Sequence, residues 1–232
     1  MQGFDLTAIL LNPEYSAMLI RGVGMTFVIA LGSWLLAMTL GVLLLAIRQA
    51  GRIPDGAVAA YVSYHRNVPT LVQLMLWYFG IASLLPDALQ IWLGEHNGEA
   101  IFAIVSLGLC QAAYFSEDLR SGLRAVGTGQ AEAARALGHG QIGTLRYVLV
   151  PQALRNALPA LINHSVSLFK NSSLAMAIGV AELTHAVKEV ESQSFRTFEV
   201  FLLASVLYLV FSLLIMAAGA LLGQRTRLAG AR

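Results

Sequence analysis

Charged residues are scarce in this chain of 232 residues. Asp, Glu, Lys and Arg make up 12% of the sequence, whereas soluble domains carry about 25%. Cysteine is rarer still, because Cys110 stands alone within an apolar segment, and this excludes an intrachain disulfide and any Cys/His metal spacing. The only lysines are Lys170 and Lys188, and neither follows a glycine-rich loop. The GxxxxGK(S/T) phosphate-binding motif is therefore absent, and the chain cannot hydrolyse ATP by that route.

Hydrophobic residues fill most of the remaining sequence: they account for 57% of it, and the mean hydropathy is +0.68. A membrane span needs about 20 apolar residues to cross a hydrocarbon core of about 30 Å. Windows that meet this need lie at residues 22–47, 57–85, 101–123, 156–180 and 199–222. Together they use nearly the whole chain. We therefore expect one domain over residues 1–232, an all-α membrane protein with five transmembrane helices.

The first 21 residues lack a basic stretch followed by an apolar core, which argues against a cleavable signal peptide. Instead, a short amphipathic helix at the membrane interface is predicted from Leu10, Leu11, Tyr15, Met18 and Leu19. We expect the first span to begin only after this helix.

Basic residues are distributed unevenly between the links that join the spans. Arg52 lies in the first link, and arginines surround the link near residue 140. The link near residue 90 is acidic and has neither Lys nor Arg, the link near 190 is mainly acidic, and the chain ends with Arg225, Arg227 and Arg232. Because Lys and Arg mark cytoplasmic loops, this distribution predicts an outside N-terminus and a cytoplasmic C-terminus.

A polar stretch at residues 127–153 separates the third and fourth spans. Thr128 is suited to cap a short helix over Gln130 to Leu137, and Gly138 supplies a left-handed stop after it. Further glycines let the chain fold back before Pro151 opens the next helix. The pattern predicts a compact helix-turn-helix protrusion tied to membrane segments at both ends.

This stretch resembles the EAA loop in the membrane subunits of bacterial ABC importers. That loop has Glu-Ala-Ala, then Leu-Gly, and roughly a dozen positions later Leu-Pro-Gln-Ala. Val150 stands where the family usually has Leu, and the matching residues are Glu132, Ala133, Ala134, Leu137, Gly138, Pro151, Gln152 and Ala153. The resemblance implies a coupling loop at about residues 125–155 that docks on an ATP-hydrolysing subunit. The alternative is an ordinary helical hairpin between two spans.

The docking itself has a physical rationale in the short helix. Ala133 and Ala134 allow close approach to a groove, while Glu132 and Arg135 give polar fixation. The residues expected at the ATPase contact are Glu132, Ala133, Ala134, Arg135, Leu137 and Gly138. The resemblance also implies that ATP and Mg²⁺ are used by the partner ATPase, so we expect no cofactor and no metal in this chain.

Polar residues interrupt the spans at three places, and each is a functional candidate because polar groups are costly in hydrocarbon. In the second span Arg66 precedes Pro69, with Thr70 and Gln73 one turn apart on a common face. An arginine in that setting can hold a carboxylate through a bidentate pair.

The other two interruptions lie in the third and fourth spans. Glu117 is one turn from Tyr114 and from Arg120, which predicts a polar stripe facing the bundle interior and a carboxylate suited to an ammonium group. The fourth span is interrupted by Lys170, Asn171, Ser172 and Ser173. The short polar side chains among them compete for backbone hydrogen bonds. The alternative is that Arg66, Glu117 and Lys170 neutralise one another or snorkel.

These interruptions carry a second resemblance. The arrangement is similar to that in the polar-amino-acid uptake branch of ABC permeases; it consists of Arg66, Pro69 and Gln73, then Tyr114 with Glu117, then the group that begins with Lys170. The sequence Arg-Asn-Val-Pro at residues 66–69 is similar to that in the glutamate/aspartate members of the branch. The resemblance implies type I ABC importer permease architecture in the bacterial inner membrane. The implied substrate-binding residues are Arg66, Thr70, Gln73, Tyr114, Glu117, Lys170, Asn171, Ser172 and Ser173. Thr70 departs from the pattern, because a small apolar residue is common there. Arg66 and Lys170 favour an anionic substrate side chain.

The implied partners are a dimer of ATP-binding subunits, a second permease chain that is identical or homologous, a periplasmic amino-acid-binding protein and the amino acid; no nucleic acid is expected. A competing hypothesis is a stand-alone ion-coupled carrier or membrane enzyme that uses Arg66, Glu117 and Lys170. Five spans are few for a self-sufficient carrier, and no inverted repeat is visible. Copurification with an ATPase separates the two hypotheses.

Overall fold

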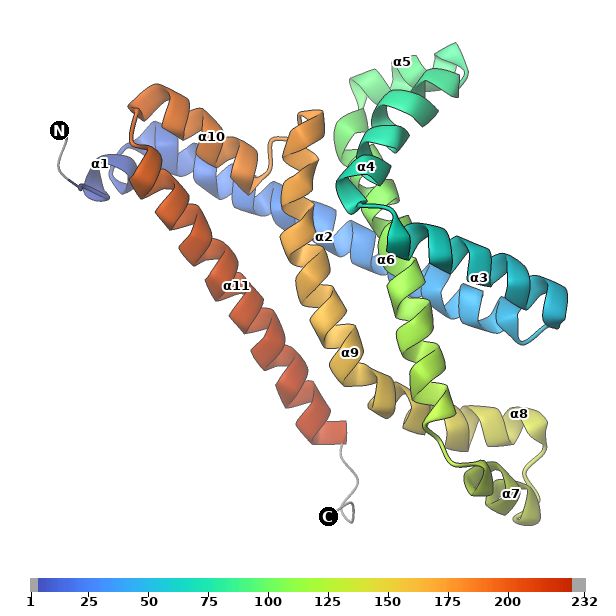
Figure 1. The fold of residues 1–232 in the computed structure, drawn as a ribbon. Coiled ribbons are helices and arrows are strands. Elements are labelled where there is room, and N and C mark those ends of the chain that lie inside the picture. Colours follow the sequence, from blue (N-terminus) through green and yellow to red (C-terminus); the bar gives the residue numbers. More distant parts are fainter. Residues whose placement is uncertain (1–3, 227–232) are drawn as a thin grey trace.

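The computed structural model describes residues 4–226, and Figure 1 shows them as a bundle of helices of unequal length. No strand occurs in these residues, which confirms the all-α prediction. The predicted basic tail residues Arg227 and Arg232 lie outside the described part. In chain order the elements are α1 (Thr7–Leu10), α2 (Pro13–Arg48), α3 (Arg52–Asn67), α4 (Thr70–Met75), the π-helical η1 (Leu76–Ile81), the 3₁₀ turn η2 (Ala82–Leu84), α5 (Asp87–Glu95), α6 (Gly98–Arg124), α7 (Thr128–Ala136), α8 (Gln141–Thr144), the π-helical η3 (Leu145–Leu149), α9 (Val150–Asn171), the 3₁₀ turn η4 (Ser172–Ile178), α10 (Leu183–Ser194) and α11 (Thr197–Thr226).

Helix α6 is the centre of the bundle: α2, α3, α4, α5 and α9 all contact it, and α11 packs on α9 (Figure 1). Phe115 and the small residues Ala112 and Ala113 are fully buried on α6, so neighbouring helices approach it closely. By contrast, α2 and α11 keep large apolar side chains exposed, such as Leu31 and Leu214. Those faces are suited to contact lipid or another protein.

Helix α2 begins earlier than the sequence analysis predicts. The Asn12 side chain accepts hydrogen bonds from the amides of Glu14 (2.9 Å) and Tyr15 (3.3 Å), and Pro13 occupies the first turn, where no amide is needed. Residues from Tyr15 to Leu19 therefore form the first turns of α2, and the prediction that they belong to a separate interface helix is wrong. Among the described residues before α2, only the four of α1 form a helix.

Three helices of the described chain are long and apolar enough to cross a membrane: α2, α6 and residues Thr197–Gln224 of α11. The window at 57–85 is broken, since α3 and Thr70–Leu84 meet at an angle of 106°; the pair counts as a fourth span if the two are taken as one. Val68 is extended because Pro69 follows it and has no amide to continue the helix. The window at 156–180 corresponds to α9 and η4, which are less apolar than these spans and are not among the helices that meet the requirement for crossing a membrane.

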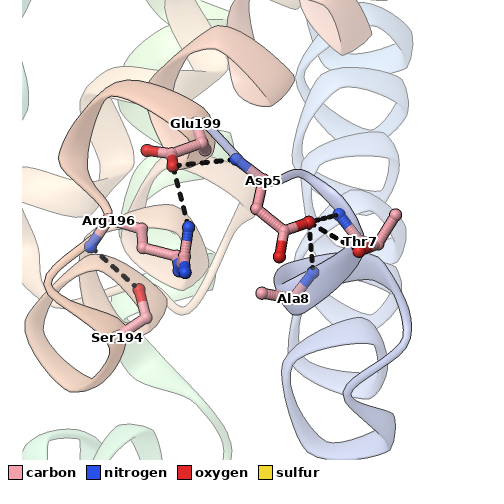
Figure 2. A network of polar contacts seen from close by, with 6 residues as sticks. All are labelled: Asp5, Thr7, Ala8, Ser194, Arg196 and Glu199. Atoms are coloured by element: carbon pink, nitrogen blue, oxygen red, sulfur yellow. Dashed lines mark hydrogen bonds and ion pairs between the residues drawn. The ribbon is translucent and has the colours of Figure 1, made fainter. Parts of the chain in front are cut away.

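Figure 2 shows how the N-terminal segment is joined to the start of α11. The Asp5 amide donates to Glu199 Oε1 (3.3 Å), and Arg196 Nη1 donates to the same oxygen (3.0 Å). Asp5 Oδ1 in turn accepts hydrogen bonds from the amides of Thr7 (2.9 Å) and Ala8 (3.3 Å) and from the Thr7 hydroxyl. The hydroxyl bond is the main reason that the pKa of the Asp5 carboxyl lies below its usual value of 3.8.

Candidate functional site

The break between α3 and α4 is held by the side chain of Gln73. Its Nε2 donates to the carbonyls of His65 (3.0 Å) and Val68 (2.7 Å), and its Oε1 accepts from His65 Nδ1 (2.5 Å). These carbonyls need a partner because α3 stops at Asn67 and Pro69 offers no amide. Gln73 is 1% exposed. In this structure it fixes the break, and the ligand contact expected of it stays a prediction.

Beside the break, Arg66 reaches from α3 to α6. Its guanidinium carbon lies 5.5 Å from the centre of the Tyr114 ring, which is a cation–π distance. Arg66 is exposed and forms no ion pair within residues 4–226. Its five N–H donors are therefore available to an incoming anion. Thr70, half-buried across the break, has its hydroxyl 3.7 Å from Cys110 Sγ.

Tyr114 extends this contact to α9. Its ring lies 5.0 Å from the ring of His164, and His164 Nδ1 donates to Asp118 Oδ2 at 2.6 Å. The Asp118 side chain is only 10% exposed, so the histidine is the chief partner of this carboxylate. Arg66, Tyr114, His164 and Asp118 thus form one line of contacts across α3, α6 and α9, which we call the Arg66 line. Neither His164 nor Asp118 was predicted as a site residue; the i,i+4 spacing of Tyr114 and Asp118 on one face of α6 was the available signal.

Glu117 lies in a different group of residues, the Arg48 cluster, formed by Arg48, Asp55, Glu117 and Arg120. Glu117 Oε1 lies 2.6 Å from Arg48 Nη1 and 3.8 Å from Arg120 Nη1, while Asp55 Oδ1 lies 3.4 Å from Arg48 Nε. Three residues make less than one helical turn, so Glu117 is offset from the Tyr114 face towards α2. The predicted polar stripe is therefore divided, and Glu117 pairs with Arg48 and not with Arg66 or Lys170 among the described residues.

The predicted interruption of the fourth span is present at residues 170–173. Helix α9 ends at Asn171 and tightens into the 3₁₀ turn η4, which contacts α4 and α6. The Ser172 hydroxyl donates to the Phe169 carbonyl (2.6 Å), and the Ser173 hydroxyl donates to the Lys170 carbonyl (2.7 Å). Both serines are thus bonded to their own backbone. Lys170 is exposed and Asn171 half-buried, which leaves these two side chains nearer to the surface.

Helix α7 begins the loop that the sequence predicts to couple to an ATPase. Its N-cap is Gly127 and no side chain caps it; Thr128 is the first helical residue, so the prediction that Thr128 caps the helix is wrong. The chain leaves the helix through Gly138, whose φ of +86° confirms the predicted left-handed stop. A side chain at position 138 would strain this conformation, because only glycine adopts it readily.

Most residues predicted at the ATPase contact are on the surface of the loop. Leu137 is 82% exposed, whereas Ala134 is 3% exposed and faces the loop interior. The remaining members are all exposed: Glu132, Ala133, Arg135 and Gly138. The contact of these residues with an ATPase stays a prediction.

The second half of the loop leads without a gap into α9. Helix α8, η3 and α9 follow one another, and Pro151 lies in the first turn of α9, as predicted. Gln152 Nε2 donates to Gln130 Oε1 (3.2 Å), which ties the start of α9 to α7. In Figure 1 α7 and α8 project beyond the ends of α6 and α9, which confirms the predicted protrusion.

Comparison with known proteins agrees with this arrangement. A family model described as "Binding-protein-dependent transport system inner membrane component" matches residues 35–228. The chain is 29% identical over 224 residues to the "Glutamate/aspartate import permease protein GltJ" of Escherichia coli K12, covering 94% of this chain and 91% of that protein. It is 30% identical over 217 residues to the "Arginine transport system permease protein ArtQ" of Bacillus subtilis 168, covering 90% and 95%. The fold is similar to that in "Crystal structure of an amino acid ABC transporter with histidines", with a TM-score of 0.82, 28% identity and coverage of 97% and 100%.

Proposed function

The chain belongs to the family of binding-protein-dependent transport system inner membrane components, and on that basis we propose that it is the permease subunit of an ABC importer for an amino acid. The proposed substrate has an acidic side chain, glutamate or aspartate, and crosses the inner membrane by alternating access. The proposed partners are a dimer of ATP-binding subunits that uses ATP and Mg²⁺, a second permease chain and a periplasmic binding protein. The proposed topology has five spans, with α9 and η4 as the fourth and α11 as the fifth, an outside N-terminus and a cytoplasmic C-terminus.

The observation that carries the substrate proposal is the Arg66 guanidinium, which lies over Tyr114 with no ion-pair partner in the described residues. A guanidinium matches a carboxylate in shape and charge and can bind it through two parallel hydrogen bonds. The His164 imidazole lies on the other side of Tyr114, and its hydrogen bond to Asp118 holds the imidazole ring in place. The substrates named for GltJ and ArtQ carry opposite side-chain charges, so the relatives do not choose between them. The proposal of an acidic substrate therefore rests on the positive charge of Arg66.

The loop supports the proposed coupling to an ATPase. Its tip exposes Leu137 and the polar pair Glu132 and Arg135, and its far end continues into α9. Helix α9 carries His164, so a displacement of the loop has a continuous helical path to the Arg66 line. The loop and the Arg66 line are thus joined through η3 and α9, which has Pro159 in its interior, and motion along this path is part of the proposal.

The test is uptake by the transporter assembled in proteoliposomes with its ATPase and binding protein. We expect Arg66→Ala to lower ATP-driven uptake of glutamate and aspartate at least tenfold, because a hydrogen bond to a charged group contributes about 1.5–3 kcal/mol. Arg66→Lys keeps the charge but loses the bidentate geometry and should retain part of the uptake. Lys188→Ala is the control, since Lys188 is an exposed cation that pairs only with Glu191 in the described chain.

Three results would count against the proposal. Unchanged uptake of acidic amino acids in Arg66→Ala, with preserved assembly, would remove Arg66 from the substrate site. Uptake by this chain without ATP or an ATPase would instead support a stand-alone ion-coupled carrier. Equal loss of assembly and uptake would assign Arg66 a structural role.

A further inference from the structure

A cavity of about 300 Å³ lies at the end of α2 and α6, away from the Arg66 line. Its walls carry three arginines and one carboxylate: the lining residues are Arg48, Gln49, Asp55, Arg120, Leu123 and Arg124. The volume falls at the lower end of the range of small-ligand sites, which is about 300–1,000 Å³. Nothing in the proposed transport of an amino acid uses this cavity, so its cationic lining needs a separate explanation.

The charges around the cavity do not balance. Arg48, whose side chain is 6% exposed, pairs with Glu117 at 2.6 Å and lies 3.4 Å from Asp55. Arg120 lies 3.8 Å from the same two carboxylates. Arg124 is exposed and pairs with no carboxylate in the part of the chain that the structure describes. Three cations therefore face two anions, and one positive charge remains.

Hydrogen-bond donors also remain unused. A guanidinium offers five N–H donors, and the 3.8 Å contacts of Arg120 exceed hydrogen-bond distance. The buried Nε of Arg48 has no hydrogen-bond partner within the described residues. A tetrahedral oxyanion placed in the cavity would meet donors from several arginines at once, which is the geometry that favours phosphate.

We propose that this cavity binds a phosphate group with a single negative charge, presented by the headgroup of an anionic phospholipid. One negative charge neutralises the one positive charge that remains when the three arginines are set against Asp55 and Glu117. The position fits, because α2 ends at Arg48 and α6 ends at Arg124, so the cavity lies where two membrane-spanning helices leave the hydrocarbon. Basic pockets between spans at this depth are suited to bind lipid headgroups. The inference does not depend on which amino acid is transported.

The test titrates the assembled, detergent-purified transporter with phosphatidylglycerol or phosphatidylcholine and counts bound lipids by native mass spectrometry. We expect phosphatidylglycerol to bind more tightly, and Arg124→Gln to weaken its binding about fivefold, the contribution of one arginine at a membrane surface. Arg124→Lys should restore most of the binding. Arg52→Gln is the matched control, because Arg52 is an exposed arginine of the same region that does not line the cavity.

A second arm distinguishes the source of the phosphate. In phosphatidylcholine nanodiscs, inorganic phosphate should leave the thermal unfolding of the transporter unchanged if the ligand is the lipid. Stabilisation by inorganic phosphate that Arg124→Gln abolishes, without preference for phosphatidylglycerol, would uphold the phosphate site but assign it to a soluble ion. Equal weakening by Arg124→Gln and Arg52→Gln, or no Arg124-dependent binding of lipid or phosphate, would overturn the proposal. The transport proposal is tested by uptake and not by lipid binding, so a negative result in the lipid-binding experiments leaves it unaffected.

Discussion

The loop formed by α7 and α8 and the helix α10 are both polar segments between apolar helices, and they lie at opposite ends of the bundle (Figure 1). Helix α10 is packed onto its own chain: Leu183, Val187 and Val190 are fully buried and lie in one cluster with residues of α2 and α11. In α7 only Ala134 is buried. Leu137 and Ile142 of the loop are more than 80% exposed.

The beginnings of the two helices differ in the same way. Glu182 caps α10 by accepting hydrogen bonds from the amides of Thr184 and His185, both at 2.9 Å, and the Tyr208 hydroxyl donates to it at 2.9 Å. Gly127 caps α7 without any side-chain hydrogen bond. The intramolecular contacts therefore fix α10, whereas the loop leaves its apolar side chains exposed. The difference separates a segment that stabilises the fold from one whose exposed side chains fit the proposed contact with an ATPase.

The largest expected effect on stability comes from the packing of α10 on α2. A Cβ at Gly22 would lie 2.8 Å from Ala186 Cβ, 3.0 Å from Leu183 Cα and 3.1 Å from the Glu182 carbonyl. Since two of these atoms belong to the backbone, the clash cannot be relieved by a rotamer change. We expect Gly22→Leu to destabilise the chain by about 3 kcal/mol, measured as a loss of thermal stability in detergent.

Gly24→Leu is the control for this change. It adds the same side chain on the same helix, where no atom lies within 4 Å of the new Cβ, and leucine has the higher helix propensity. Its stability should equal or exceed that of the original chain. Similar losses in both variants would mean that the contact between α2 and α10 contributes little.

The next effect concerns Glu182, which is fully buried. Glu182→Ala leaves the amides of Thr184 and His185 and the Tyr208 hydroxyl without their acceptor, so we expect a loss of about 2 kcal/mol in thermal or denaturant unfolding. Glu189→Ala, on the same helix, is the control, because its hydrogen bond to Gln193 is exposed. Its loss should be close to zero, and a loss as large as that of Glu182→Ala would contradict the importance of the cap.

Glu182 also predicts a pH dependence. Burial raises the pKa of its carboxyl above the usual value of 4.5, although hydrogen bonds to the α10 amides oppose the shift. A raised pKa in the folded state means that the protonated form is favoured by folding, so this stability is present below pH 4.5 and is lost as the pH rises through the folded pKa. Glu182→Gln does not titrate and should lack this slope, although its single amide oxygen replaces only one of the two carboxylate oxygens that cap α10.

Features that depend on a few adjacent residues could be predicted from the sequence. The break at Pro69, the left-handed stop at Gly138 and the loop after α6 all follow from local backbone chemistry, and the structure has each of them. Asn12 and Pro13 are also a local start signal for α2, and the prediction of an interface helix from apolar spacing alone does not include it.

Pairings between distant helices could not be predicted, because they depend on how the helices cross. Glu117 meets Arg48 across 69 positions, and His164 meets Asp118 across 46. The sequence identifies Glu117 as a costly intramembrane charge but gives no crossing angle from which to choose its partner. Gln73 lies only eight residues from His65, but its hydrogen bonds depend on the angle of 106° at the break, which the sequence does not give.

The smallest expected effect on stability, and the sharpest test of the comparison, concerns the two helix ends at Leu137 and Phe195. Each is the C-cap of its helix, α7 or α10, and the two are 82% and 83% exposed. A charge at either position leaves the burial of the chain unchanged, so Leu137→Glu and Phe195→Glu should both keep the original thermal stability. If the loop is the surface that an ATPase covers, Leu137→Glu buries a charge without a partner and should abolish copurification with the ATPase, whereas Phe195→Glu should not. Loss of the ATPase in both variants, or in neither, would show that exposure at the loop does not mark the docking surface.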